Sequence, residues 1–380
     1  MLPTTRHASE IPSILPTGTA AALYAIFFLS GAAALIYEIS WMRQIGLLFG
    51  HTAQAGAIVL GSYFTGLAIG YHVGGRWLRS MSPLKAYAGA ELIAAGWACV
   101  VPSVLSLLHT ATFAGVLQHE TPSVQLVTRS LFCFVLLMPA TIAIGATLPF
   151  MARCVALRSH GDIGRASIAY AFNTLGAVIG VLSCVLFLIS LVGVRGSGLL
   201  AAALSTVCAG LAMLLSTRVR FEPAPVGDRR TRTQPLQKTV DRIGIGFSWL
   251  AMAAAVSGFA TLALEVLYLR MFSLVFHNST YTFAAVVAIF LAGLSLGAFL
   301  VRPIGRRLSS DSVLAVSMWT GAITLIASVP LFVRLTGLDY FEFGNSFPEY
   351  FAGAFGLVAI VVLPPATIHA TVLPTLWNYA

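Results

Sequence analysis

Long apolar runs, separated by short polar or charged stretches, dominate the chain from about residue 20 to its end. Most of these runs reach the length of about 20 residues that an α-helix needs to cross the hydrocarbon core of a bilayer. The sequence therefore predicts an all-α, polytopic integral membrane protein with about ten transmembrane helices. We place them at about residues 20–49, 53–74, 87–108, 124–150, 166–192, 198–215, 244–276, 279–301, 312–335 and 350–377.

A segment of the first predicted helix recurs in the seventh. Residues 30–43 read SGAAALIYEISWMR and residues 257–270 read SGFATLALEVLYLR, at an ungapped offset of 227 that continues through the following helix. Such self-similarity indicates a duplicated unit. Because a unit of six helices returns the chain to the side where it started, we predict two parallel repeats, six helices followed by four. This arrangement is similar to that of the two halves of major-facilitator transporters.

Four regions follow from this pattern. They are a polar cytoplasmic N-terminal segment (1–19), a first transmembrane repeat (20–216), a basic cytoplasmic linker (217–243) and a second, incomplete repeat (244–380). The N-terminal segment lacks the features of a secretory signal, so we expect the first helix to be retained. The second repeat lacks counterparts of two helices before Ala380, so we expect either a further C-terminal region or a shortened relative.

Composition and charge narrow the class and orient the helices. With 58% hydrophobic and 9% charged residues, the chain is unlike a soluble domain. Its net charge of +9 comes from Lys and Arg residues that mostly fall on one side if the N-terminus is cytoplasmic. We therefore expect the basic residues to meet a lipid bilayer and expect no nucleic-acid partner.

Motifs for cofactors, metals and catalysis are missing from the sequence. The five cysteines have no metal-ligand spacing, and no Ser/His/Asp, HExxH or phosphate-loop pattern occurs. We predict no cofactor, no metal site, no disulfide and no catalytic residue in this chain.

Three carboxylates inside predicted helices are the candidate functional residues. Glu38 and Glu265 occupy equivalent positions of the two repeats, and Glu91 lies near one end of the third helix. Ionisable residues within a membrane are costly to insert, and they often mark substrate or ion pathways. Arg43 and Arg270 follow the two repeated glutamates by five residues, which places them about 140° away around an ideal helix.

Two interpretations of these carboxylates remain open. Glu38 and Glu265 pair with Arg270 and Arg43 across the two halves, which only locks the halves together. Alternatively, Glu38, Glu265 and Glu91 line a cavity for a small cationic substrate, with aromatic side chains available for cation–π contacts. The aromatic candidates are Tyr37, Trp41 and Tyr268.

Other polar and small residues are candidates for helix packing. Asn173 is expected to bond the backbone of a neighbouring helix. The glycine pairs Gly66 and Gly70, and Gly293 and Gly297, have the spacing that lets helix backbones approach closely. Weaker candidates are His51 and Asn278, at equivalent positions, and His369 within a proline-rich segment.

Several long segments of the chain resemble the membrane-fused spermidine synthase-like proteins of bacteria. The matching segments are SGAAALIYEISWMR (30–43), LGSYFTGLAIGYHVGG (60–75), PLKAYAGAELIAAG (83–96), IGATLPFMAR (144–153) and AYAFNTLGAVIG (169–180). The resemblance covers nearly everything from residue 20 onward and implies a multi-pass protein of the bacterial cytoplasmic (inner) membrane.

The same resemblance implies a transporter-like membrane domain followed by a cytosolic aminopropyltransferase domain. No stretch of this chain has the soluble glycine-rich pattern of such a domain, so aminopropyl transfer would require a catalytic domain from elsewhere. We expect a transporter-like module that binds or moves a small cationic metabolite such as a polyamine. The alternatives are a non-catalytic scaffold or accessory subunit with a protein partner in a membrane complex, or a membrane anchor of such an enzyme.

Overall fold

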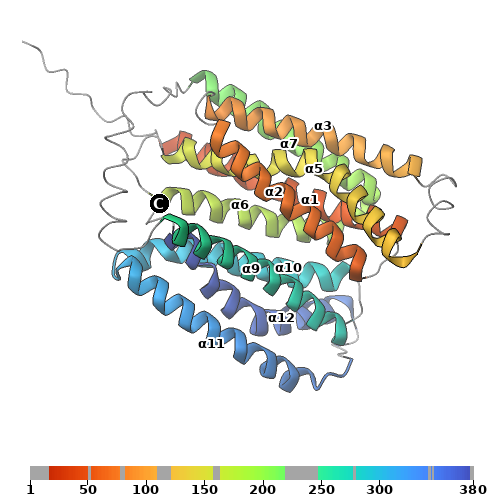
Figure 1. The fold of residues 1–380 in the computed structure, drawn as a ribbon, viewed down its shortest axis with the longest axis vertical. Helices are drawn as coiled ribbons and strands as arrows, with labels where there is room; N and C mark the ends of the chain where they lie inside the picture. Colours follow the sequence, from red (N-terminus) through yellow and green to blue (C-terminus); the bar gives the residue numbers. More distant parts are fainter. Residues whose placement is uncertain are drawn as a thin grey trace, which may run out of the picture.

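A computed structural model shows the chain as a bundle of long helices (Figure 1). It describes residues 17–49, 53–77, 82–108, 121–156, 163–218, 247–276, 280–340, 344 and 346–376. Within these ranges every regular element is helical. The N-terminal segment before residue 17 and residues 219–246, which include nearly all of the predicted linker (217–243), lie outside the described residues.

The described residues of the first half form seven elements. They are α1 (Thr17–Phe49), α2 (Ala53–Trp77), α3 (Pro83–Leu108), α5 (Pro122–Ala156), α6 (Ile163–Ser183), the π-helical turn η1 (Cys184–Leu188) and α7 (Ile189–Arg218). The second half forms α9 (Phe247–Val275), α10 (Thr280–Gly305), α11 (Ser310–Thr336), α12 (Phe347–His369) and the short α13 (Val372–Leu376).

Nine helical stretches of the described chain are long and apolar enough to cross a membrane. One of them, Arg165–Arg218, has 54 residues, which at 1.5 Å per residue would be about 80 Å long and far exceed a bilayer core of about 30 Å. This stretch bends at Gly193, whose φ of 73° and ψ of 176° are not helical. The chain is therefore a multi-pass, all-helical membrane protein, and the bend divides the stretch close to the predicted boundary between the fifth and sixth helices.

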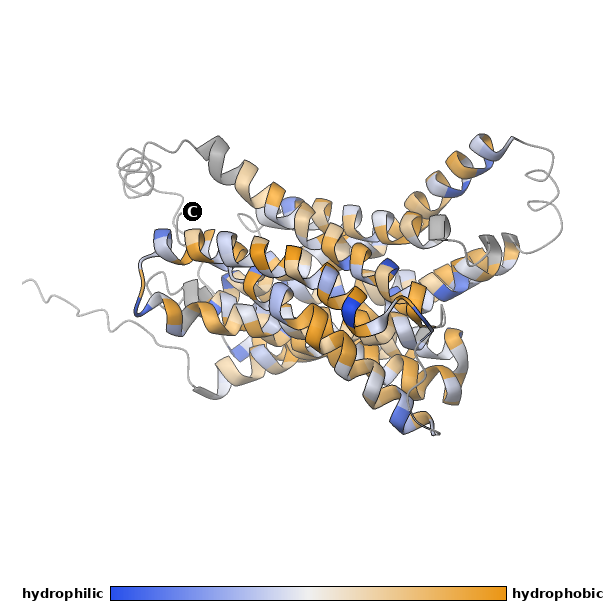
Figure 2. Cartoon of the chain, turned by 90° about the horizontal axis from the view of Figure 1, so that it is seen from below, coloured by the Kyte–Doolittle hydropathy of each residue, from blue (hydrophilic) through white to orange (hydrophobic). Residues whose placement is uncertain are grey.

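Hydrophobic residues occur along the whole length of the helices (Figure 2). Many large apolar side chains are exposed, among them Phe259 on α9 and Trp319 on α11. Such surface is costly in water but matches the hydrocarbon of a bilayer. The exposed apolar surface agrees with the membrane assignment made from helix length.

The same tight helix contact occurs once in each half. A methyl group on Gly66 of α2 would overlap Thr141 of α5, and one on Gly293 of α10 would lie 2.7 Å from the Ala366 side chain of α12. Glycine lets the two backbones approach at these crossings, as small residues do in membrane helices. These crossings depend on glycines at equivalent positions of the two halves. Gly66 and Gly70 let α2 pack on α5, and Gly293 and Gly297 let α10 pack on α12.

Helices α6 and α10 bring the two halves together. Ser295 of α10 donates a hydrogen bond to the Ala171 carbonyl of α6 at 2.9 Å. Phe172 of α6 contacts Phe299 of α10 edge to face, with ring centroids 5.6 Å apart, and stacks on Tyr24 of α1. The main hydrophobic core includes Ala284, Val287 and Ala288 of α10 beside residues of the first half. The interface between the halves is therefore mostly apolar.

Candidate functional site

The two repeated glutamates both lie buried, one in each half of the bundle. Glu38 of α1 is 2% exposed and Glu265 of α9 is 5% exposed. Glu265 lies close enough to Glu38 for the charges of the two carboxyls to interact. The pair combines one carboxyl from each half of the bundle.

Two tyrosines from neighbouring helices accompany the glutamates. Tyr63 of α2 lies within electrostatic reach of Glu38, and its hydroxyl donates to the Ala34 carbonyl of α1 at 2.9 Å. Tyr170 of α6 has the same relation to Glu265. The sequence analysis missed both tyrosines, and the repeat offers no signal for Tyr63, since the equivalent residue is Phe290.

The four glutamate and arginine side chains of the repeats form no ion pair with one another. Glu38 Oε1 has no hydrogen-bond partner in the described part of the chain. Arg270 is exposed and Arg43 is half-buried, near Cys184. The spacing of five residues turns each arginine well away from the glutamate of its own helix. Between these four described side chains the structure therefore has no ion pair of the first interpretation, and both carboxyls are buried.

The aromatic candidates separate into two groups. Tyr37 and Trp41 are stacked on each other with centroids 5.1 Å apart, and Trp41 contacts Tyr63 at 6.4 Å. These three side chains belong to one hydrophobic core, in which Tyr63 lies within electrostatic reach of Glu38. Tyr268 lies in the core of the second half, where its hydroxyl and that of Ser328 are 3.0 Å apart. The structure places Tyr268 away from the Trp41 group.

Glu91 belongs to a separate polar cluster inside the first half. It is 3% exposed and accepts a hydrogen bond from Ser30 of α1. Ser205 of α7 and Tyr87 of α3 also lie beside its carboxyl. The hydroxyls of Tyr37 and Tyr87 have no hydrogen-bond partner of ordinary geometry here. Glu91 is thus held by hydroxyl groups that join α1, α3 and α7.

The packing candidates lie at contacts between helices. Asn173 of α6 donates to the Phe27 carbonyl of α1 at 2.9 Å, and its backbone lies where a methyl group on Gly31 would overlap it. His369 Nε2 lies 3.2 Å from the Ser257 carbonyl, which joins α12 to α9. His51 and Asn278 lie outside the described residues.

The carboxyl pair is closed to solvent in this conformation, since both side chains are nearly inaccessible. A separate cavity of about 390 Å³ lies at one end of the helices of the first half, where α1 and α3 end. Gln44 and Arg195 are among the residues that line it. The described residues contain no group of three or more His, Cys, Asp and Glu side chains arranged to hold a metal ion.

Comparisons with known proteins give limited information. No protein-family model matches the sequence, and no curated protein matches it either. Two solved structures of a POT family transporter align with 94% of this chain and 89% of theirs. The structure in complex with 5-aminolevulinic acid has 15% identity and a TM-score of 0.41, and that with a thioalcohol-conjugated peptide has 14% and 0.38. The multi-pass helical assignment rests on the helices of this chain.

Proposed function

We propose that this protein is a transporter-like membrane module that binds a small organic cation between Glu38 and Glu265. The observation that carries the proposal is a pair of buried carboxyls, one from each half, with no basic partner in the described residues. Intramembrane carboxyls commonly mark a substrate or ion pathway.

Electrostatics favours a cationic ligand at this site. Two carboxylates close together in a low-dielectric interior repel each other, and burial removes the water that would stabilise them. A bound positive charge relieves both effects. Tyr63, within electrostatic reach of Glu38, and Trp41, whose ring contacts that of Tyr63, supply aromatic surface, and such surface attracts organic cations.

A polyamine is the ligand class that we propose. Its two or more ammonium groups suit two carboxyls, and the spermidine synthase-like resemblance of residues 30–43 and 169–180 points to the same class. In this proposal the halves rock about the α6–α10 interface and open the closed site alternately to each side of the membrane.

Binding of putrescine and spermidine to the purified chain in nanodiscs would test the site. We expect Glu38→Gln and Glu265→Gln each to weaken binding by about tenfold or more, because each removes one charge from a poorly solvated pair. Glu91→Gln is the matched control, since it changes a buried carboxyl that belongs to the Ser30 cluster. Equal binding by all four proteins, or no binding by any, would overturn the cation site.

Uptake of the same polyamines into proteoliposomes separates binding from transport. Uptake that saturates and fails in Glu38→Gln and Glu265→Gln would support a transporter. Binding without uptake would leave a polyamine-binding module and contradict the transport step.

A scaffold is the second candidate, because one face of α9 lacks a neighbour that its repeat has. Gly31 of α1 packs against Asn173 of α6, whereas a methyl group added to the equivalent Gly258 of α9 would have no atom of the described chain within 4 Å. Phe259 beside it is exposed. A helix of a partner protein would cover this face, as α6 covers α1.

The intact mass of the protein from its native membrane, with whatever co-purifies, distinguishes the remaining alternatives. A stoichiometric partner that is lost in Gly258→Leu would favour the scaffold. A mass well above 40.2 kDa would favour a membrane anchor that carries an aminopropyltransferase domain. A mass near 40.2 kDa without a partner would favour the transporter-like module.

A further inference from the structure

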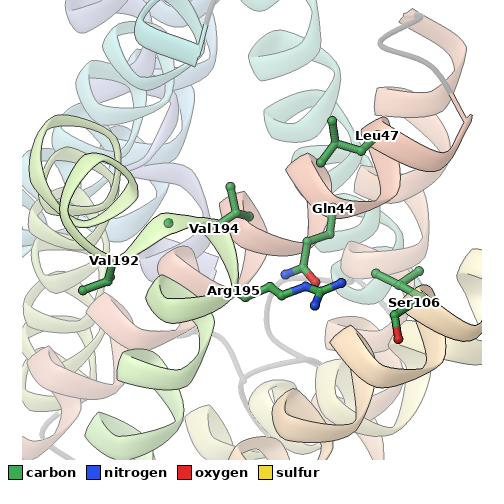
Figure 3. Close-up of a pocket in the computed structure, with 8 residues that line it drawn as sticks. Gln44, Leu47, Ser106, Val192, Val194 and Arg195 are labelled. Atoms are coloured by element: carbon green, nitrogen blue, oxygen red, sulfur yellow. The ribbon is translucent and has the colours of Figure 1, made fainter. Parts of the chain in front are cut away.

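A cavity of about 390 Å³ opens where α1 and α3 end and the chain bends at Gly193, inside α7 (Figure 3). Its walls include Gln44, Leu47, Ser106, Val192, Gly193 and Arg195. The volume is within the range of small-ligand pockets, about 300–1,000 Å³. None of these residues belongs to the carboxyl pair.

Gln44 is a buried donor without an acceptor. Its side chain is only 8% exposed, and Nε2 has no hydrogen-bond partner in the described chain. A buried amide N–H without a partner costs about 1–3 kcal/mol. In Figure 3 the Gln44 side chain points from α1 toward Arg195, at the cavity that both residues line. An acceptor that enters the cavity would satisfy this amide.

Arg195 supplies a positive charge to the same cavity. It is exposed, and no carboxylate of the described chain forms an ion pair with it. Ser106 of α3 also lines the cavity, where its hydroxyl donates to the Ser103 carbonyl at 2.9 Å. Among the described residues that line the cavity there is no Asp or Glu. Its charge therefore favours an anion.

The bend at Gly193 adds to this preference. Val194 and Arg195 are the first residues of the helical segment that follows the bend, and both line the cavity. The first N–H groups of a helix lack carbonyl partners within it, and the helix dipole makes this end positive. Leu47 and Val192 give the cavity an apolar margin that is partly exposed.

We propose that this cavity binds an oxyanion, a phosphate or carboxylate group, between the Arg195 guanidinium and the Gln44 amide. The guanidinium offers a fork of N–H donors that fits such a group, and the amide adds a fixed donor from a second helix. The oxyanion belongs to an anionic lipid headgroup or to a small soluble anion, and both sources use the same contacts.

Two binding measurements on the full chain separate these sources. Native mass spectrometry counts retained phosphatidylglycerol after purification in mixed phosphatidylglycerol and phosphatidylcholine nanodiscs. Calorimetry in pure phosphatidylcholine nanodiscs measures the binding of inorganic phosphate and of succinate. Each measurement is made on the wild type, Arg195→Gln, Gln44→Leu and the control Arg334→Gln, which changes an exposed arginine on the last turn of α11.

We expect Arg195→Gln to weaken oxyanion binding about tenfold or more and Gln44→Leu to weaken it severalfold, because they remove a charged and a neutral donor. Arg334→Gln should have no effect. Retention of phosphatidylglycerol alone identifies a lipid site, and binding of phosphate or succinate identifies a soluble anion.

Failure of all three probes, or an equal loss in Arg334→Gln, overturns the proposal. A thermal unfolding curve of each variant checks folding, and since Arg195 is exposed, its substitution should leave the curve unchanged. Neither measurement involves Glu38 or Glu265, so its outcome is independent of the cation site.

Discussion

Two buried serines, Ser30 and Ser62, differ in what their hydroxyl groups bond. Ser30 donates to a carboxyl that is 3% exposed and reaches no water. Ser62 of α2 is equally buried, but it donates to the Ile58 carbonyl of its own helix at 2.7 Å. The Ser30–Glu91 hydrogen bond joins α1 to α3. The Ser62 hydroxyl instead bonds a carbonyl that already accepts a backbone hydrogen bond within α2.

Replacing Ser30 by alanine should therefore destabilise the fold by about 1–3 kcal/mol, because it removes the hydroxyl that donates to the buried Glu91 carboxyl and leaves only the neighbouring Ser205 and Tyr87 hydroxyls beside it. Ser62→Ala, the matched control, should cost less than about 1 kcal/mol, since its carbonyl partner keeps its helical bond. Thermal unfolding in one detergent compares the two. A loss for Ser62→Ala that equals that of Ser30→Ala would contradict the distinction.

Helix contacts repeat in this molecule because the glycines that permit them repeat. Gly66 and Gly293 each meet a neighbouring helix at a distance that leaves no room for a methyl group. Gly61, on the same helix as Gly66, has nothing within 4 Å of the equivalent position. Gly66 and Gly293 are therefore needed for the close approach of the helices, whereas Gly61 is not.

Gly66→Ala should destabilise the protein by about 1–3 kcal/mol, since the methyl group is forced against the buried Thr141 side chain. Gly61→Ala should be neutral or stabilising by up to about 1 kcal/mol, because alanine favours the helix. Unfolding temperatures of the two variants provide the test. The prediction fails if Gly61→Ala is as damaging as Gly66→Ala.

The helices were predictable from the sequence because their signals are long and local. Apolar length sets the spans, and the offset of 227 between Glu38 and Glu265 reveals the repeat. The bundle was accordingly predicted as all-helical and multi-pass, as the structure shows. Pro139 and Pro149 lie within α5, whereas the related segment of the second half ends its helix at His369.

The neighbours of each side chain were not predictable in the same way. A helical spacing tells which residues share a face, but which helix covers that face depends on tertiary packing. Tyr63 and Tyr170 approach the glutamates from α2 and α6, and no pattern in the sequence marks them. The open cavity around Gln44 and Arg195 was missed for the same reason.

At the scale of the whole molecule, the halves meet through the packing of α6 against α10. Phe172 and Phe299 meet across the halves with ring centroids 5.6 Å apart. Phe272 and Phe332 meet at 5.1 Å within the second half alone. A transporter that works by rocking needs the first pair to separate or slide, whereas the second pair moves as part of one body.

A short thiol-reactive cross-link between Phe172→Cys and Phe299→Cys should abolish polyamine uptake while leaving binding measurable. The same cross-link between Phe272→Cys and Phe332→Cys should leave uptake nearly unchanged. Both pairs are introduced with Cys99→Ser, because Cys99 is exposed. Uptake that survives the first cross-link would contradict movement of one half against the other.

The bend at Gly193 also decides how the chain is built during synthesis. With φ of 73° and ψ of 176°, this residue adopts a backbone conformation that is essentially confined to glycine, and no neighbour crowds it. The helical segments before and after Gly193 are therefore joined with almost no loop between them. If Gly193→Leu let the apolar stretch continue as a single crossing, the second half would insert upside down. A cysteine at Arg307, in the exposed turn after α10, would then react with impermeant thiol reagents from the opposite side of the membrane.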